Sequence, residues 1–172
     1  MKKCIYIPFV AFLMCSCIWS MEDIQFLVFF KNETADTLRL YIAEGFYTDT
    51  PTAYPDTLLP ADRIIKVSNY RDAPLSERLG WVYPYSEGPA IHLLGTDPEK
   101  ALRDRLPADT LSVFIISADT LSKYGYDEVA KNNRLLVRYD LSISNLKRLG
   151  WTIPYPPTEQ MKGMKMFVPN PK

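Results

Sequence analysis

Residues 112–117, S-V-F-I-I-S, form the most apolar and most strand-like stretch of the region 109–157, around which the chain is organised. The four apolar residues 113–116 place two side chains on each face of a strand, and β-branched and aromatic types predominate among them. This pattern predicts a central strand that is buried on both faces.

The segments that follow predict helical turns and a second strand. Asp119 can cap one helical turn, and another turn is expected over residues 127–131. Residues 134–140, R-L-L-V-R-Y-D, alternate apolar with charged side chains. The alternation predicts a strand with one face in water, and Arg138 and Asp140 belong to the wet face.

A short helix and a third strand complete this region. Ser142 is expected to be the N-cap of the helix, and Gly150 is expected at its C′ position, where a left-handed residue ends a helix. Residues 151–153 predict a short strand, which Pro154 and the prolines after it end.

Three runs in this region carry a resemblance: D-T-L-S-V-F-I-I-S-A-D-T-L-S-K-Y at 109–124, R-Y-D-L-S at 138–142 and L-G-W-T-I-P-Y-P-P at 149–157. They resemble the C-terminal half of a family of small, uncharacterised lipoproteins of Bacteroidetes. The resemblance covers roughly the last third of the chain. It implies a location in the envelope and a fold, but no mechanism, because the family carries no assigned activity.

The N-terminal residues 1–16 have the composition of a lipoprotein signal peptide. Lys2 and Lys3 precede an apolar run that is too short to span a bilayer. The sequence L-M-C-S-C that follows resembles a lipobox, in which Cys17 is acylated and becomes the mature N-terminus. The alternative is a plain secretory peptide. Ile18 after the cysteine is typical of lipoproteins sent to the outer membrane, so we expect residues 17–23 to form a lipidated tether.

The composition predicts one β-rich domain over residues 24–157, followed by a flexible tail at 158–172. The chain has 172 residues and a formal net charge of zero, which gives no reason to expect a nucleic acid partner. Its 11 Tyr, 8 Phe and 3 Trp favour strands. We predict a mainly β fold, an antiparallel β-sandwich of the immunoglobulin or transthyretin type, with about seven strands and short helices in the crossovers.

Several elements of this domain are expected before residue 109. The firmest is a hairpin that joins strands at 26–30 and 36–42 through the turn-prone residues 32–35. Further strands are expected at 62–68 and 90–94, and helices are expected at 72–79 and 98–106.

The motif R-L-G-W-x-x-P-Y occurs twice, at residues 78–85 and 148–155. A duplicated half-domain is one interpretation, and two uses of one helix-to-strand device is the favoured one. A functional interpretation makes the aromatic residues a platform for sugar or peptide. The candidate ligand-binding residues are then Trp81, Tyr83, Tyr85, Trp151 and Tyr155.

Several catalytic chemistries lack their motifs in this sequence. It contains no glycine-rich phosphate loop, H-E-x-x-H, C-x-x-C or G-x-S-x-G, and its three cysteines all lie within the first 17 residues. The one histidine, His92, is flanked by apolar residues, which favours a core or edge position over a catalytic one. We assign no catalytic residue, metal site or cofactor. A periplasmic hydrolase that uses carboxylates or His92 is the alternative.

Two weaker patterns suggest modification and metal binding. The triplet Asp-Thr-Leu occurs four times and resembles an O-glycosylation acceptor of exported Bacteroidetes proteins, with candidates Thr37, Thr57, Thr110 and Thr120. It is also ordinary sequence before a strand or helix. The spacing of Met161, Met164 and Met166 could offer thioethers to Cu(I), as a second alternative function.

Together these patterns predict a lipoprotein anchored in the outer membrane through its N-terminal lipid. Its domain is expected to be a non-catalytic binding or structural module of the envelope that contacts protein or glycan.

Overall fold

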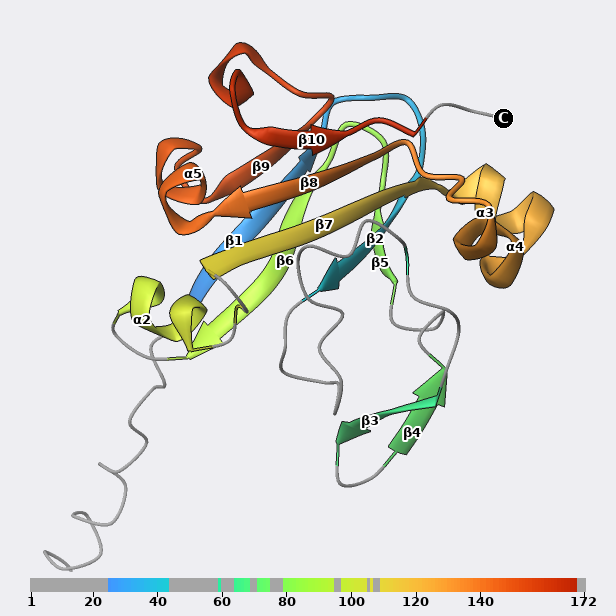
Figure 1. The fold of residues 1–172 in the computed structure, drawn as a ribbon, viewed down its shortest axis with the longest axis horizontal. Helices are drawn as coiled ribbons and strands as arrows, with labels where there is room; N and C mark the ends of the chain where they lie inside the picture. Colours follow the sequence, from blue (N-terminus) through green and yellow to red (C-terminus); the bar gives the residue numbers. More distant parts are fainter. Residues whose placement is uncertain are drawn as a thin grey trace, which may run out of the picture.

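The structure is a computed structural model, and it describes residues 25–43, 59, 64–68, 71–74, 79–94, 97–104, 106 and 109–169. This part of the chain is mainly β, with short helices (Figure 1). None of the described helices is long and apolar enough to cross a membrane. The predicted signal peptide and tether, with Cys17, lie outside the described residues, and so does Thr57.

The strands form two main sheets and a separate two-stranded ladder. The three-stranded sheet has the order β6-β1-β9 and consists of β1 (Gln25–Asn32), β6 (Glu87–Leu94) and β9 (Thr152–Tyr155). The five-stranded sheet has the order β10-β8-β7-β2-β5 and consists of β2 (Leu38–Ala43), β5 (Gly80–Val82), β7 (Thr110–Ser117), β8 (Val137–Ser142) and β10 (Lys165–Phe167). The ladder joins β3 (Ile64–Ser68) to β4 (Arg71–Pro74).

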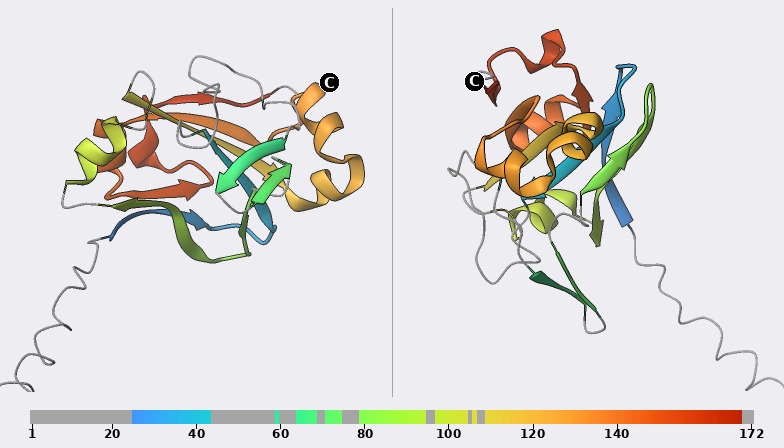
Figure 2. Two further views of the ribbon diagram at one scale, coloured as in Figure 1. Left: turned by 90° about the horizontal axis from the view of Figure 1, so that it is seen from below. Right: turned by 90° about the vertical axis from the view of Figure 1, so that its right-hand side faces the viewer.

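The helices lie at the two ends of the sheets. α2 (Pro98–Arg103) and α5 (Ile143–Arg148) lie at one end, and α3 (Ala118–Tyr124) and α4 (Tyr126–Lys131) lie at the other (Figure 1). In the right-hand view of Figure 2, β1 and β6 form a layer beside the other strands.

The strand that contains residues 112–117 is the centre of the five-stranded sheet, as predicted. β7 pairs with β2 on one side and with β8 on the other, and all six residues from Leu111 to Ile116 are buried. Val113 and Ile115 face the three-stranded sheet, whereas Phe114 and Ile116 belong to a second apolar cluster on the opposite face.

The main core lies between the two sheets. The three-stranded sheet contributes Val28, Phe30, Ile91, Leu93 and Ile153, and the five-stranded sheet contributes Leu38, Leu40, Val113, Ile115, Val137 and Tyr139. Leu102 of α2 and Leu146 of α5 extend the same cluster. The two sheets therefore share one core.

The predicted hairpin at residues 26–42 is wrong in its pairing, although both strands exist. β1 pairs with β6 and β9, whereas β2 pairs with β5 and β7, so the connection between them crosses from one sheet to the other. Alternation of apolar residues specifies which side chains face the core but does not specify the neighbouring strand. The pairing of β1 with β9 is parallel, so the expectation of a wholly antiparallel arrangement is also wrong.

The wet face predicted for residues 134–140 is also wrong, because Arg138 and Asp140 are almost fully buried. Arg138 Nε donates a hydrogen bond to Asp140 Oδ1 at 2.7 Å, and the hydroxyl of Ser112 donates to the same oxygen at 2.7 Å. The Arg138 guanidinium also lies 5.1 Å from the ring of Phe114 and 5.4 Å from that of Phe167. The two charges can be buried because they are paired, since an unpaired charge would lose its hydration without compensation.

α5 has the local structure that its sequence predicts. Ser142 and Asn145 form a reciprocal capping box at its N-terminus. At its C-terminus Gly150 has φ 60°, its N–H bonds the carbonyl of Lys147, and the N–H of Trp151 bonds the carbonyl of Leu146. These two bonds define a Schellman motif, which satisfies carbonyls that the helix leaves open.

Other helix predictions are corrected in part. The helix expected from residue 72 is wrong at its start, since Arg71–Pro74 is strand β4, paired with β3. Ser117, not Asp119, is the N-cap of α3. α2 begins as expected, because the Asp97 side chain accepts hydrogen bonds from the N–H groups of Glu99 and Lys100.

The flexible tail predicted from residue 158 is wrong for residues 159–167. A 3₁₀ turn, η4 (Glu159–Met161), is followed by β10, which pairs with β8. Met161 and Met164 are buried in the main core. The segment is ordered because two unbranched apolar side chains enter the core and the strand completes the hydrogen bonds of β8.

Candidate functional site

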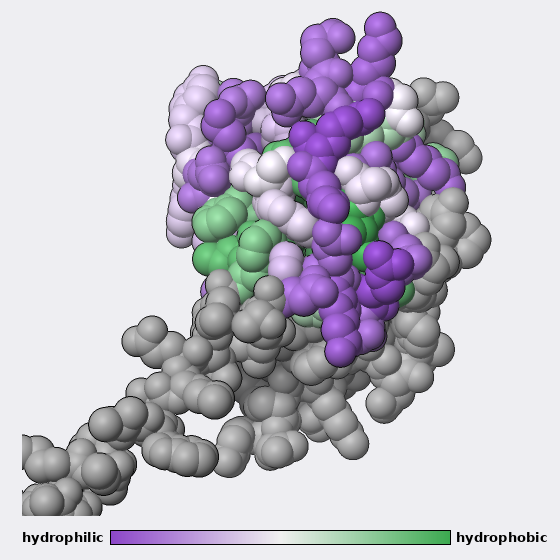
Figure 3. Space-filling view, turned by 90° about the vertical axis from the view of Figure 1, so that its left-hand side faces the viewer, coloured by the Kyte–Doolittle hydropathy of each residue, from purple (hydrophilic) through white to green (hydrophobic). Residues whose placement is uncertain are grey.

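The side of the molecule that carries α2 and α5 has the character of an ordinary solvated surface. Its described surface is mostly hydrophilic, with hydrophobic surface at one margin and in smaller areas between the polar side chains (Figure 3). The exposed ion pair of Lys147 with Glu99, at 2.6 Å, joins the two helices here. Surface pairs of this kind stabilise little and indicate a solvated face.

A second end of the molecule brings three chain connections together, and we call it the loop end. It consists of residues 33–37 between β1 and β2, residues 83–86 between β5 and β6, and residues 155–158, which begin with the last residue of β9. Backbone hydrogen bonds join them: from Glu33 N–H to Tyr155 O at 2.8 Å, from Tyr85 N–H to Thr34 O at 3.1 Å, and from Asn32 N–H to Ser86 O at 2.8 Å. Segments far apart in sequence thus form one surface.

The buried side chain of Asn32 joins two connections of the loop end by hydrogen bonds. It makes four such bonds. Oδ1 accepts from the backbone N–H of Thr34 at 3.0 Å and from its hydroxyl at 2.7 Å. Nδ2 donates to the carbonyl oxygens of Asp36 at 2.7 Å and Tyr83 at 2.9 Å. All four hydrogen-bonding positions of the amide are used, so the two connections are fixed relative to each other.

Three aromatic side chains on the first copy of R-L-G-W-x-x-P-Y project into solvent. Trp81, Tyr83 and Tyr85, which we call the aromatic trio, are 58%, 64% and 74% exposed. Large aromatic side chains are usually buried to a greater extent than this, and an exposed group of them is a recognised mark of binding surfaces. The exposure of these three rings is what the platform interpretation of the motif expects of this copy.

The backbone beneath the aromatic trio is held in place. The guanidinium of Arg39 lies 3.8 Å from the centre of the Trp81 ring, and its Nη2 donates to the carbonyl of Leu79 at 2.9 Å. Burial lowers the pKa of Arg39 from its ordinary value. The hydroxyl of Ser86 donates to the carbonyl of Tyr83 at 2.7 Å, and Tyr85 has a left-handed φ of 49°. A left-handed backbone is uncommon for tyrosine.

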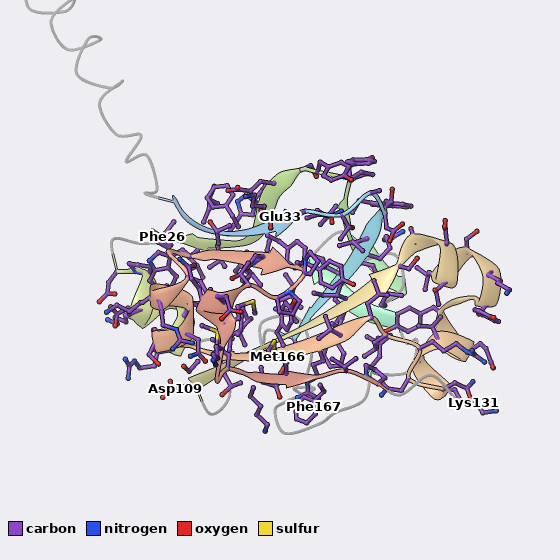
Figure 4. The ribbon with its side chains drawn as sticks, turned by 90° about the horizontal axis from the view of Figure 1, so that it is seen from above. Phe26, Glu33, Asp109, Lys131, Met166 and Phe167 are labelled. Carbon is purple, nitrogen blue, oxygen red and sulfur yellow. The ribbon has the colours of Figure 1, made fainter. Side chains whose placement is uncertain are left out.

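The second copy of the motif is arranged differently. Trp151 is partly buried, and its ring meets Phe26 edge-on, with centroids 4.9 Å apart. Phe26 precedes Glu33 by seven residues of extended chain, which is about 23 Å. Figure 4 labels both residues and shows them well apart. Trp151 is therefore remote from the aromatic trio.

Tyr155 belongs to the loop end, although it is only partly exposed. Burial raises the pKa of its phenol, and the nearby charge of Asp36 raises it further. Of the five aromatic residues proposed from the sequence, Tyr83, Tyr85 and Tyr155 lie at the loop end, although Tyr155 packs against the core. Trp81 lies on the adjoining strand β5, and Trp151 lies apart from the others. The two motif copies also differ at glycine, since Gly150 has a left-handed φ whereas Gly80 begins strand β5.

A hollow of about 300 Å³ lies beside Tyr85. Its lining is formed by Lys31, Asn32, Glu33, Tyr85, Ser86 and Glu87. Lys31 Nζ lies 2.6 Å from Glu33 Oε1. The hydrogen bond and charge of Glu33 raise the pKa of Lys31, and the charge of Glu87 adds to the effect. The hollow therefore presents hydrogen-bond donors and acceptors next to an exposed ring.

Residues proposed for other chemistries lie elsewhere. His92 is exposed on the edge strand β6, opposite Leu27, and it does not line the hollow. Met161 and Met164 are inside the core, where their thioethers are not available to a surface ion, and Met166 is partly buried. In the described ranges no group of three or more His, Cys, Asp and Glu side chains is placed to hold a metal ion.

The described glycosylation candidates are all partly buried. Thr37 lies just before β2, Thr110 is the first residue of β7, and Thr120 lies in the first turn of α3. They thus occupy starts of elements, where Asp-Thr is also ordinary sequence.

Sequence reasoning missed Asn32, Arg39 and the charged lining of the hollow. Asn32 lies in a stretch recognised as turn-prone, but its partner Tyr83 is 51 residues further along the chain. Lys31, Glu33 and Glu87 look like ordinary solvated charges when taken one at a time.

Fold and surface define the chain as a mainly β protein of two packed sheets with an exposed aromatic loop end. Comparison of the chain with protein-family models, with curated proteins and with solved structures gave no match.

Proposed function

We propose that the protein is a lipoprotein of the outer membrane, anchored through acylated Cys17, whose domain is a non-catalytic binding module for protein or glycan in the envelope. The observation that carries the binding role is the aromatic trio. Three large exposed rings on strand β5 and the hydrogen-bonded turn that follows it lose little conformational freedom when a ligand docks, which favours binding.

We also propose a β-sandwich of the immunoglobulin or transthyretin type for the fold. Support comes from the core shared by the two sheets and from connections that cross between them, at 33–37 and 83–86. Such sandwiches present their connecting loops at the ends of the sheets, as does the connection that carries Tyr83 and Tyr85.

The proposed location rests on the N-terminal sequence and on the family resemblance. A charged start, a short apolar run and a cysteine after a small residue are the features that lipoprotein export requires. A lipid-anchored domain meets its ligands within the envelope or at the cell surface.

Lipid attachment and location are tested together on intact cells. We expect acylation of the wild-type chain and its loss in Cys17→Ala. Protease added to whole cells would digest a surface-displayed domain, whereas a periplasmic domain would be protected until the outer membrane is opened. Acylation that persists in Cys17→Ala would contradict the anchor.

The binding role is tested with the aromatic trio replaced. Purified full-length mature protein is incubated with envelope protein and envelope polysaccharide fractions, and saturable binding is measured. We expect Trp81→Ala/Tyr83→Ala/Tyr85→Ala to lose that binding. Tyr124→Ala, which removes another exposed aromatic ring on α3, is the matched control and should retain it. Equal binding by the triple variant would contradict the role of the trio.

A further inference from the structure

We infer that the hollow beside Tyr85 binds one ring of a neutral or amino-bearing saccharide, stacked on the Tyr85 ring with its hydroxyl groups on Glu33, Glu87 and Lys31. The inference rests on the proposed binding function and names the ligand class of the same site. Four features of the hollow support it: the exposed Tyr85 ring, the polar lining, the volume and the charge.

The Tyr85 ring is available for stacking and its backbone is fixed. The side chain is the most exposed of the aromatic trio, and its N–H is bonded to Thr34 O. A pyranose ring has an apolar C–H face and a polar rim. The face of an aromatic ring carries partial negative charge, so it attracts the weakly positive C–H groups of that face.

The polar lining complements the rim of a sugar ring. Carboxylates of Glu33 and Glu87 accept hydrogen bonds, and the ammonium of Lys31 donates them. A hydroxyl group can do both, so adjacent hydroxyls can bond to neighbouring donors and acceptors. An apolar peptide side chain in the same hollow would desolvate these charges without replacing their bonds, at a cost that disfavours it.

The size of the hollow limits the ligand to a small unit. A volume of about 300 Å³ is at the lower limit of small-molecule sites. It accommodates one sugar ring, and further rings of an oligosaccharide would extend towards Tyr83 and Trp81. We expect weak binding for a single unit, strengthened by repetition along a chain.

The charge of the lining selects among saccharides. Glu33 and Glu87 carry two negative charges and Lys31 carries one positive charge, which its 2.6 Å contact with Glu33 already offsets. The local field is therefore negative. Uronic acids and phosphorylated sugars are repelled by it, and an amino sugar is attracted.

The test starts with an array of neutral, amino-bearing and acidic oligosaccharides and the full-length mature protein in a zwitterionic detergent, since glucoside detergents would compete. Isothermal titration then measures the best neutral or amino-bearing trisaccharide against trigalacturonic acid. We expect binding of the former, with at least tenfold weaker binding of the latter.

Variants assign binding to the hollow. Tyr85→Asn removes the ring but tolerates a left-handed backbone, and Glu87→Gln keeps the shape of the side chain without its charge. We expect at least tenfold weaker binding for Tyr85→Asn, and a reduced preference against trigalacturonic acid for Glu87→Gln. Phe167→Ala is the control, because Phe167 lies on the opposite side of the view from Glu33 (Figure 4).

The possible results distinguish failure of the saccharide inference from failure of the proposed binding function. Saccharide binding that survives Tyr85→Asn would overturn the site, and a preference for acidic sugars would overturn the charge argument. If no saccharide on the array binds, while envelope protein binds through the aromatic trio, the saccharide inference is wrong and the proposed function stands. If neither binds, both are wrong.

Discussion

Asn32 and Tyr139 are both buried, yet only Asn32 has its side-chain hydrogen bonds satisfied. The amide of Asn32 makes four bonds, whereas the hydroxyl of Tyr139 has no partner within the core. The buried charges of Arg138 and Asp140 are satisfied only in part. The two side chains form an ion pair, but each of them keeps one buried polar atom that has no hydrogen-bond partner. The position of a polar residue in the chain does not reveal which of these cases applies.

Replacing Asn32 tests its role as the internal tie of the loop end. Asn32→Ala removes four hydrogen bonds, two to the carbonyl oxygens of Asp36 and Tyr83 and two from the N–H and hydroxyl of Thr34, and we expect a loss of about 3 kcal/mol in the free energy of unfolding. Urea denaturation measures it. Asn132→Ala, whose bonds to Glu128 are exposed, should change stability by less than about 0.5 kcal/mol. If both variants lost a similarly small amount of unfolding free energy, Asn32 would not have the proposed role in the loop end.

Replacing Tyr139 tests the cost of its unpaired hydroxyl. Tyr139→Phe keeps the ring and removes the buried OH, so we expect stability at pH 7 to rise by about 1 kcal/mol. Tyr83→Phe, which removes an exposed hydroxyl, should leave it unchanged. A loss of stability in Tyr139→Phe would mean that the hydroxyl has a partner after all.

The same residue predicts an alkaline limit to stability. Burial raises the pKa of the Tyr139 phenol above its ordinary value of 10.0, and the nearby Tyr155 raises it further. The folded chain therefore keeps a proton that the unfolded chain releases above pH 10. Its contribution to stability is complete below pH 10 and falls as the pH rises beyond it. Thermal melting between pH 9 and pH 11.5 should show a smaller decline for Tyr139→Phe than for the wild type.

At the scale of elements, short sequence patterns predicted helix ends and a buried strand correctly, but they predicted the wrong pairing of strands. Ser142 and Gly150 set the ends of α5, because capping depends on residues a few positions apart. The apolar run at 113–116 likewise predicted a strand that is buried on both faces. In contrast, β1 and β2 looked like a hairpin, and their partners β6, β9 and β7 lie far along the chain. The loop end was unpredictable for the same reason, since its three connections meet only after folding.

The C-terminal segment is expected to behave as part of the core. Met161 is fully buried, so Met161→Ala should lower the free energy of unfolding by about 2–5 kcal/mol through the lost transfer energy and the cavity. Met166 is only partly buried on β10, and Met166→Ala should cost less than half as much. Chemical denaturation compares the two. Equal effects would mean that the segment does not enter the core as described.

At the scale of the whole molecule, one core joins both sheets, two helices and the C-terminal segment. We therefore expect these parts to unfold in a single transition. A Trp19→Phe/Trp81→Phe variant leaves Trp151, which packs on Phe26, as the fluorescent probe. Its transition in urea should coincide with that of the circular dichroism of the backbone. An earlier fluorescence transition would show that the end near α5 opens separately.

The burial of Met161 and Met164 also bears on when the chain can fold. The core lacks two of its side chains, and β8 lacks its outer partner, until residues 161–167 are available. Neighbouring strands in each sheet are mostly distant in sequence, which makes folding slow. A chain emerging from a ribosome would therefore stay open until residues 161–167 have been synthesised and released. Under the proposed export of the chain across a membrane, that delay would allow translocation to begin before a stable structure forms.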